Sequence, residues 1–452
     1  MKKILFTLLI GASVNASANT DSLFIRKIYD EAMANGDAYE NLRSLCKDIG
    51  ARITGSAEAK MAVIWGKQLL DSYGFDEVYL QEIDVPHWER GTKEAAWIMN
   101  EKGDIHKLNV IALGGSVSTN GLLEGEVIAV NSIEEMEALG EEKIKGKIVF
   151  FNKPFDQKLL QTFHAYGTCI DVRHEGTNAA SKLNAKAVVI RSLSSSTDTH
   201  PHTGSMKYDP GVDSIAGAAI STVDSDILMD WLSKGKVNLK LEMDCKNYGF
   251  EKSHNVIAEL KGNKDNKIIT FGGHLDSWDV GEGAHDDGAG IVHSIEALRI
   301  LNHLNYEPKH TLRCVLFMNE ENGNFGGKNY ARIAKEKGEE HICALETDRG
   351  GFLPIGFDIW GTDEQVKAVQ AYAPLLRSFQ LYKFDAGYSG VDIRPLKDYY
   401  PDMIQLGMAI SSQRYFDFHH AETDVFESVH KRELHLGAAA LAAMIYIMDQ
   451  SL

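Results

Sequence analysis

The sequence predicts an α/β fold with a mostly parallel central sheet flanked by helices, and a smaller α/β unit inserted into it. Beyond residue 253, apolar strands alternate with helical patterns, which is typical of a mostly parallel sheet. Between residues 126 and 221 the predicted strands are shorter. Residues 114–121 are small and polar, with the composition of a linker between the two parts.

The first part of the chain is helical in pattern from residue 22 to residue 80, with a break at residues 50–56. Residues 57–73 form an amphipathic helix, because apolar residues recur there at three- and four-residue steps. Within the insert we expect strands at residues 126–130, 147–151, 187–190 and 218–221, and helices at residues 133–139 and 224–232.

The central sheet is expected to take its strands from residues 267–272, 311–318, 343–347 and 403–408. Its helices are expected at residues 288–301, 328–336, 363–378 and 431–448. We therefore predict a discontinuous main domain, residues 20–118 with 239–452, interrupted by an insert of residues 119–238.

The amino terminus has the features of a secretory signal peptide. Lys2 and Lys3 precede a short apolar stretch at residues 4–11, and the small residues 16–18 provide a cleavage site after Ala18. We expect residues 1–18 to be removed and the mature protein to be secreted or periplasmic. No apolar run, this one included, reaches the roughly 20 residues that a membrane span needs.

Composition and charge exclude some classes of partner. The 452 residues are 44% hydrophobic and 25% charged, as in a globular protein, and the formal net charge is −17. A basic surface that binds nucleic acid or anionic lipid is therefore not expected. The five cysteines lack the C-x-x-C spacing of a structural zinc site, and an odd count leaves at least one thiol unpaired. Cys314 and Cys343 lie in apolar runs and are predicted to be buried.

Histidine and acidic side chains stand at the ends of the predicted strands of the central sheet or in the loops that follow. Ligands bind beyond the carboxyl ends of the strands in such sheets, so these side chains should meet at one edge. They are His274 and Asp276; His285, Asp286 and Asp287; Glu320 and Glu321; Glu346 and Asp348; and His419, His420, Glu422 and Asp424.

Each of these motifs is weak alone, and their coincidence at one edge is what indicates a metal site. Carboxylates that converge would repel one another and raise each other's pKa unless cations neutralised them. Imidazoles mixed with carboxylates favour Zn²⁺ over Mg²⁺ or Ca²⁺, which prefer oxygen ligands.

The motifs resemble, in the same order, those of the co-catalytic dizinc exopeptidases, and most of all the carboxypeptidase Q group of that family. The matching blocks are residues 50–56, 255–258, 274–277, 283–290, 320–321, 346–350 and 419–424. The insert resembles a protease-associated domain through residues 145–149 and 215–224. The resemblance covers nearly all of the mature chain and implies a fold of the zinc exopeptidase type with a protease-associated α/β insert.

The resemblance implies two zinc ions per chain. One zinc would be bound by His274 and Asp348 and the other by Glu321 and His420, with Asp286 bridging both. His420 is preferred to His419 because the ligand of the family stands four residues before an aspartate, here Asp424.

The resemblance also implies the catalytic roles. Glu320 would be the general base, and Asp276 the partner that orients His274 and strengthens it as a ligand. Two residues depart from the family pattern, because Asn319 stands where glycine is frequent and Val425 where threonine is usual. Neither departure removes a ligand.

The expected substrates are short peptides or dipeptides, and a homodimer is compatible with the resemblance; carboxypeptidase, aminopeptidase and dipeptidase activity stay open. One alternative is a non-catalytic peptide-binding protein on the same fold, but such proteins have lost metal ligands that are present here. A single-zinc acyl transferase of the glutaminyl cyclase type is disfavoured by Asp286 and by the insert. A dimetal phosphatase would need more carboxylate and asparagine ligands. Residues 200–204, which contain two histidines, are predicted to be a loop rather than another metal site.

Overall fold

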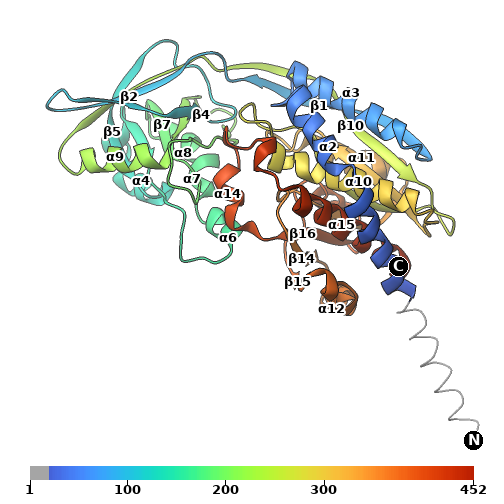
Figure 1. Cartoon of the computed structure of the whole chain (residues 1–452). Coiled ribbons are helices and arrows are strands. Elements are labelled where there is room, and N and C mark those ends of the chain that lie inside the picture. Colours follow the sequence, from blue (N-terminus) through green and yellow to red (C-terminus); the bar gives the residue numbers. More distant parts are fainter. Residues whose placement is uncertain (1–19) are drawn as a thin grey trace, which may run out of the picture.

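The computed structural model describes residues 20–452, so the predicted signal peptide, residues 1–18, lies outside the described residues. Figure 1 shows two α/β lobes that lie side by side and are joined by long strands. Each lobe contains one eight-stranded sheet. The predicted α/β fold is confirmed. Within residues 20–452, no helix combines the length and the hydropathy that crossing a membrane requires.

The larger sheet has the strand order β1-β10-β12-β11-β13-β16-β14-β15. Four central strands run parallel and are those predicted from the sequence: β12 (Thr311–Phe317), β11 (Lys267–His274), β13 (Glu340–Glu346) and β16 (Ile404–Ile410). Every residue of β12 and β16 is buried, which explains why these strands are continuous apolar runs. The outer strands are β1 (Glu77–Glu89), β10 (Lys246–Leu260), β14 (Pro354–Trp360) and β15 (Lys383–Ala386).

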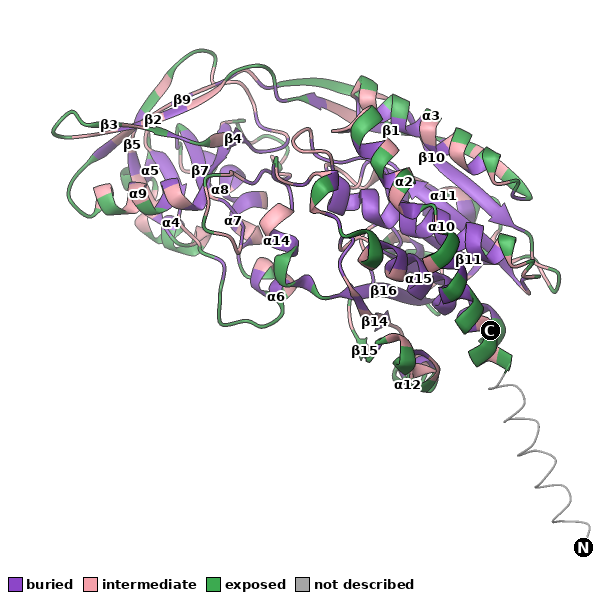
Figure 2. Ribbon diagram, viewed as in Figure 1, coloured by how far each residue is buried: buried purple, intermediate pink, exposed green. Residues whose placement is uncertain are grey.

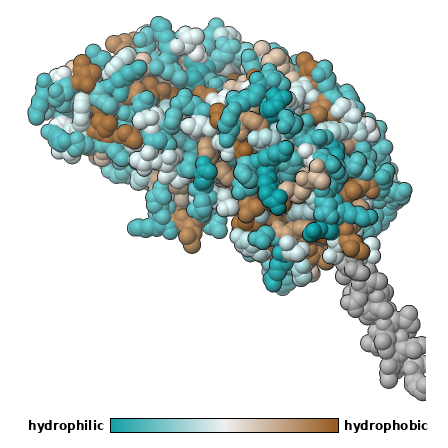
Figure 3. Space-filling view, in the orientation of Figure 1, coloured by the Kyte–Doolittle hydropathy of each residue, from teal (hydrophilic) through white to brown (hydrophobic). Residues whose placement is uncertain are grey.

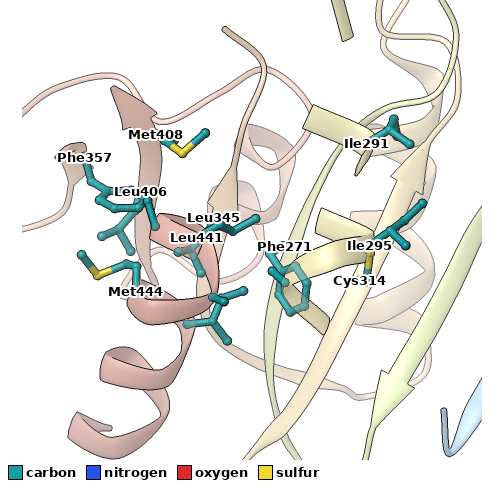
Figure 4. Packing of buried hydrophobic residues seen from close by; sticks show 14 of the residues in the cluster. Phe271, Ile291, Ile295, Cys314, Leu345, Phe357, Leu406, Met408, Leu441 and Met444 are labelled. Atoms are coloured by element: carbon teal, nitrogen blue, oxygen red, sulfur yellow. The ribbon is translucent and has the colours of Figure 1, made fainter. Parts of the chain in front are cut away.

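Both faces of this sheet are covered, and the side-chain alternation of the strands divides the core. On β12, Cys314 and Leu316 belong to the main cluster, whereas Val315 and Phe317 belong to a second cluster with Tyr330. The main cluster includes α3 (Ala57–Ser72), α10 (Ala289–His303) and α15 (Lys431–Ser451), and Figure 4 shows part of it. Tyr330 lies on α11 (Phe325–Glu336).

The helices of the larger lobe differ in how far they are buried. Figure 2 shows α10 and α15 mostly buried, whereas α3 and α12 (Asp363–Gln370) expose one face. The molecular surface in Figure 3 is mostly hydrophilic, with apolar side chains in small separate groups. The predicted helix at residues 363–378 is interrupted after Gln370 and resumes as α13 (Ala373–Leu376), which contains Pro374 in its first turn.

The second sheet has the order β3-β2-β9-β5-β6-β7-β8-β4. It contains the four predicted insert strands, β5 (Leu123–Val130), β6 (Ile148–Phe151), β7 (Ala187–Arg191) and β8 (Ala216–Ile220). It also contains β9 (Val237–Met243), β2 (Glu94–Asn100), β3 (Ile105–Leu108) and β4 (Val110–Ala112). The two predicted insert helices are α4 (Ile133–Leu139) and α9 (Thr222–Leu232).

The boundaries of this lobe differ from the predicted 119 and 238. β2 pairs with β9 from Glu94 opposite Met243 to Asn100 opposite Val237, so the lobe begins near residue 94 and ends near residue 243. The linker-like residues 114–121 are a loop within the lobe. β1 and β10, which pair along their length, connect the two sheets, although the sequence pattern assigned the start of β1 to a helix.

All five cysteines are free and buried. Cys314 and Cys343 are fully buried, as predicted from their apolar surroundings.

Candidate metal centre

The predicted metal-binding side chains meet at the carboxyl edge of the four parallel strands. His274 is the last residue of β11, and the segments after β12, β13 and β16 reach the same edge. The structure brings together at this edge the side chains of His274, Asp286, Glu321, Asp348 and His420.

Asp286 lies between two histidines and presents one oxygen to each. Its Oδ1 is 3.2 Å from Nε2 of His274, which is also 3.6 Å from Oδ1 of Asp348. Its Oδ2 is 3.3 Å from Nε2 of His420, which is also 3.2 Å from Oε2 of Glu321. The site therefore consists of two halves, each with one histidine and one carboxylate of its own, that share Asp286.

The donor set fits divalent zinc. Within residues 20–452, the buried oxygens Asp286 Oδ2 and Glu321 Oε1 have no hydrogen-bond partner, and burying unpaired carboxylate oxygens is costly. Burial also raises the pKa of Glu321 to about 7, and the charge of Asp286 adds to this. Cations bound among these carboxylates would remove both penalties, and Zn²⁺ accepts imidazole and carboxylate ligands together.

Asp287, next to Asp286, accepts hydrogen bonds from main-chain groups of the site. Its Oδ2 accepts from the main-chain N–H of His274 at 3.1 Å and its Oδ1 from that of Gly290 at 3.0 Å, so it fixes His274 and the start of α10. Asp424 in turn accepts from the main-chain N–H groups of His285 at 2.7 Å and Asp286 at 3.0 Å. No role of its own was predicted for Asp287 or for Asp424, although both lie in the matching blocks.

A turn after β12 allows the neighbours Glu320 and Glu321 to reach the site together. Asn319 has a φ of 76°, a left-handed conformation that asparagine tolerates and that explains glycine as the usual residue there. The carboxylate of Asp276 accepts from the main-chain N–H groups of Asn319 at 2.6 Å, Glu320 at 3.1 Å and Glu321 at 3.3 Å.

The contacts of Asp276 differ from the expectation that its side chain orients His274. Nδ1 of His274 donates to the main-chain oxygen of Asp276 at 2.9 Å, whereas the carboxylate oxygen is 3.8 Å away. The main chain of Asp276 thus orients the imidazole, because its carboxylate is engaged by the turn that carries the two glutamates.

Glu320 lines a cleft of about 770 Å³ beside the metal site. Burial raises the pKa of Glu320 well above its ordinary value, an effect that His274 opposes and that Asp348 and Glu321 reinforce. A carboxylate beside the proposed ligands is placed to accept a proton from a bound water and to return it. The cleft is lined by both lobes, since α6 (Thr162–Gly167) and α7 (Ile170–His174) of the second lobe face the loops of the larger sheet.

A loop of the second lobe holds the segment that contains His420. The main-chain N–H of Thr203 donates to the oxygen of His420 at 3.0 Å, and Nδ1 of His420 donates to the oxygen of Thr203 at 3.2 Å. Nδ1 of His202 donates to the oxygen of His419 at 2.6 Å. Residues 200–204 therefore form a loop, as predicted, and it packs against the metal site.

The geometry distinguishes the two adjacent histidines. Nε2 of His419 is 3.8 Å from Asp286 Oδ2, while Nε2 of His420 approaches two carboxylates at 3.3 Å or less. The His419 ring stacks on the His420 ring with 3.5 Å between their centres. This arrangement supports His420 as the ligand.

Arg52 is a structural residue of the site for which the sequence suggested no role. Its fully buried guanidinium donates to the main-chain oxygens of Leu275 at 2.6 Å, Glu282 at 2.7 Å and Gly283 at 3.0 Å. It thereby joins the segment after His274 to the segment before Asp286. The one sequence feature that could have drawn attention to Arg52 is its place in the break between helical patterns at residues 50–56.

Comparison with known proteins identifies the family of this chain. Residues 255–445 match the model of peptidase family M28. Carboxypeptidase Q of Bos taurus is 33% identical over 420 residues, which cover 92% of this chain and 86% of that protein.

Solved structures give the same result. The peptidase M28 precursor of Shewanella amazonensis SB2B has a TM-score of 0.91 and 30% identity, over 96% of this chain and 97% of that one. A zinc aminopeptidase of Bacillus subtilis shares the fold, with a TM-score of 0.65 and 19% identity over 91% of this chain and 94% of its own. The chain therefore belongs to peptidase family M28 and is a metallo-exopeptidase.

Proposed function

We propose that the protein is an exported exopeptidase that hydrolyses short peptides with two zinc ions and with Glu320 as the general base. The observation that supports two ions is the position of Asp286, whose two oxygens face two histidines that each have a further carboxylate. A single-zinc acyl transferase would not require the second histidine with its carboxylate. A non-catalytic binding protein has no need of an intact set of ligands.

In this proposal five side chains hold two zinc ions. His274 and Asp348 would hold one zinc, Glu321 and His420 the other, and Asp286 both. Bound zinc lowers the pKa of water and stabilises the negative charge that develops on the attacked carbonyl oxygen.

Glu320 lines the cleft beside the proposed ligands, and in this position it would take the proton of the attacking water and return it to the leaving amine. Asp276 holds the main chain of Glu320, so the carboxylate of the base is positioned relative to its neighbour Glu321.

Two further features belong to the proposal. The second lobe, which lines the cleft through α6 and α7, is proposed to be a protease-associated domain that restricts the cleft to short substrates. Export rests on the signal-like residues 1–18 and predicts a mature chain that starts at or near Asn19.

A peptide panel of graded length, with free and blocked termini, tests the function. Protein stripped by a chelator should be inactive, and about two equivalents of Zn²⁺ should restore release of single terminal residues. Internal cleavage, or full activity after exhaustive chelation, would contradict the proposal.

A further inference from the structure

The two walls of the cleft touch each other next to the metal site. Arg349 belongs to the larger lobe and Phe163 lies on α6 of the second lobe, and both line the cleft. Cζ of Arg349 lies 5.4 Å from the ring centre of Phe163, the spacing of a cation over an aromatic ring. Arg349 directly follows the proposed ligand Asp348. Because consecutive Cα atoms are about 3.8 Å apart, the contact begins one residue from this ligand.

Arg349 is fixed on its side of the cleft. Its Nη1 donates to Oδ2 of Asp358 at 2.5 Å, and its Nη2 donates to the main-chain oxygen of Tyr388 at 2.8 Å. Lys383 donates to the other oxygen of Asp358 and lies 3.8 Å from Asp385. Two cations therefore face two carboxylates, so this group needs no charge from a substrate.

Phe163 is fixed on the other side by aromatic rings of the larger lobe. Its ring stacks on Tyr415 with 5.2 Å between their centres and lies edge-to-face with Phe416 at 5.0 Å. The preceding residue, Thr162, donates through Oγ1 to the main-chain oxygen of Ser412 at 2.9 Å. Figure 1 shows the resulting position of α6 beside α14 (Tyr415–Phe418). Moving the Phe163 ring out of the cleft would break these contacts between the lobes.

A peptide in the cleft has to stop at this contact. An extended chain advances about 3.3–3.6 Å per residue, so a substrate directed from the metal site towards Arg349 has space for about one residue. The rest of a longer substrate has to extend in the opposite direction. An aromatic ring and a paired guanidinium form the obstacle, so it excludes a second residue by size and not by charge.

We propose that Phe163 and Arg349 close one end of the cleft, so that only one substrate residue fits between the cleaved bond and this end. The inference rests on the proposed function, because it specifies how the exopeptidase is confined to a terminal residue. It makes Phe163 and Arg349 residues that determine specificity through the length of peptide they admit.

The test uses an unblocked tripeptide of three different residues, because hydrolysis of its two bonds gives dipeptides of different mass. Initial products of the wild-type enzyme should come from one bond only, since cleavage of the other would place two residues at the closed end. Phe163→Ala should raise the rate at the spared bond, relative to the other, by about 10-fold or more, the range for differences in side-chain size within a pocket. If the wild type hydrolyses dipeptides alone, Phe163→Ala should gain one of the two bonds. Phe163→Trp keeps the bulk and should retain the wild-type products.

Phe155→Ala is the matched control. Phe155 also packs on Phe416, with 5.2 Å between ring centres, but it does not line this cleft in the described part of the chain. Its substitution should leave the ratio of products as in wild type. Zinc analysis and circular dichroism identify the variants that fold, and Arg349→Ala, which removes the other half of the contact, takes the place of a Phe163→Ala protein that does not.

Wild-type cleavage of both bonds at similar initial rates would overturn the inference. An unchanged ratio of products in a folded, zinc-loaded Phe163→Ala protein would also overturn it. So would an equal rise in Phe163→Ala and Phe155→Ala, because that result would reflect loosened lobes and not an opened end. A zinc-loaded wild-type enzyme that cleaves no peptide would instead contradict the proposed function itself.

Discussion

The two halves of the candidate metal centre are held in different ways. In one half, His274 ends a buried strand and is fixed by Asp287 and by the main chain of Asp276, all within the larger lobe. In the other half, His420 lies on a loop whose main chain is bonded to Thr203 of the second lobe. One half is therefore determined by the sheet alone, and the other requires contact between the lobes.

If the proposed ligands hold zinc, this difference gives the second lobe a role in metal binding as well as in covering the cleft. A ligand at the end of a buried strand has little freedom, whereas a loop ligand depends on the groups that hold its main chain and ring. Substitutions in the two halves should therefore affect zinc binding differently.

The largest effect should come from substituting the neighbouring glutamates Glu320 and Glu321. Only Glu321 is a proposed zinc ligand, whereas Glu320 is the proposed general base. Glu320→Gln keeps every metal ligand, so zinc content should stay near wild type while turnover falls by roughly 10²- to 10⁴-fold, the contribution of general acid–base catalysis. Glu321→Gln should weaken the zinc of the His420 half, and excess Zn²⁺ should restore part of the activity.

Metal analysis together with steady-state kinetics on both variants provides the measurement. The assignment fails if Glu320→Gln empties a metal site while Glu321→Gln leaves both sites filled.

An intermediate effect should come from His202, which is buried and holds the main chain of His419. Burial lowers the pKa of His202 to about 4, so it is neutral near pH 7 and donates through Nδ1. His202→Ala should weaken one of two zinc sites by about 10- to 100-fold, the range for groups that orient ligands, and leave the other unchanged. His202→Asn, which keeps a donor at a similar position, should recover most of the affinity.

Competitive zinc titration of the two sites is the appropriate measurement. His200→Ala is the control, because the side chain of this partly exposed histidine pairs with the exposed Glu422. Equal weakening of both sites by His202→Ala would show that the halves are not held separately.

The smallest effect should come from Asn319. Its left-handed main-chain conformation allows the turn that brings Glu321 to the site. Asn319→Gly accepts the φ of 76° and should cost about 1 kcal/mol in free energy of unfolding, mostly from lost side-chain hydrogen bonds, with both zincs retained. Asn319→Val is the matched contrast, because a β-branched residue disfavours this conformation, and it should loosen the Glu321 half. Chemical denaturation and zinc analysis would measure both, and equal behaviour of the two variants would contradict this explanation.

Much of the larger lobe was predictable from the sequence. The central strands are buried on both faces and therefore appear as continuous apolar runs, and their carboxyl ends identify the edge where the site lies. In the second lobe, only the strands β5 to β8 were predicted from the sequence. β2 and β9 complete it by pairing across more than one hundred residues, and neither strand reveals its partner by composition.

The sequence by itself determined the edge of the sheet at which histidines and carboxylates gather, because the successive ends of parallel strands converge there. It did not determine which of them meet, since Glu422 at this edge is exposed and pairs with His200. Only the tertiary structure decided how they are held. Thr203 contacts His420 across 217 positions of the chain, and Arg52 joins two loops, through main-chain oxygens. Every residue has a main-chain carbonyl, so the residue types that accept these bonds leave no mark in the sequence, and only the folded chain selects them.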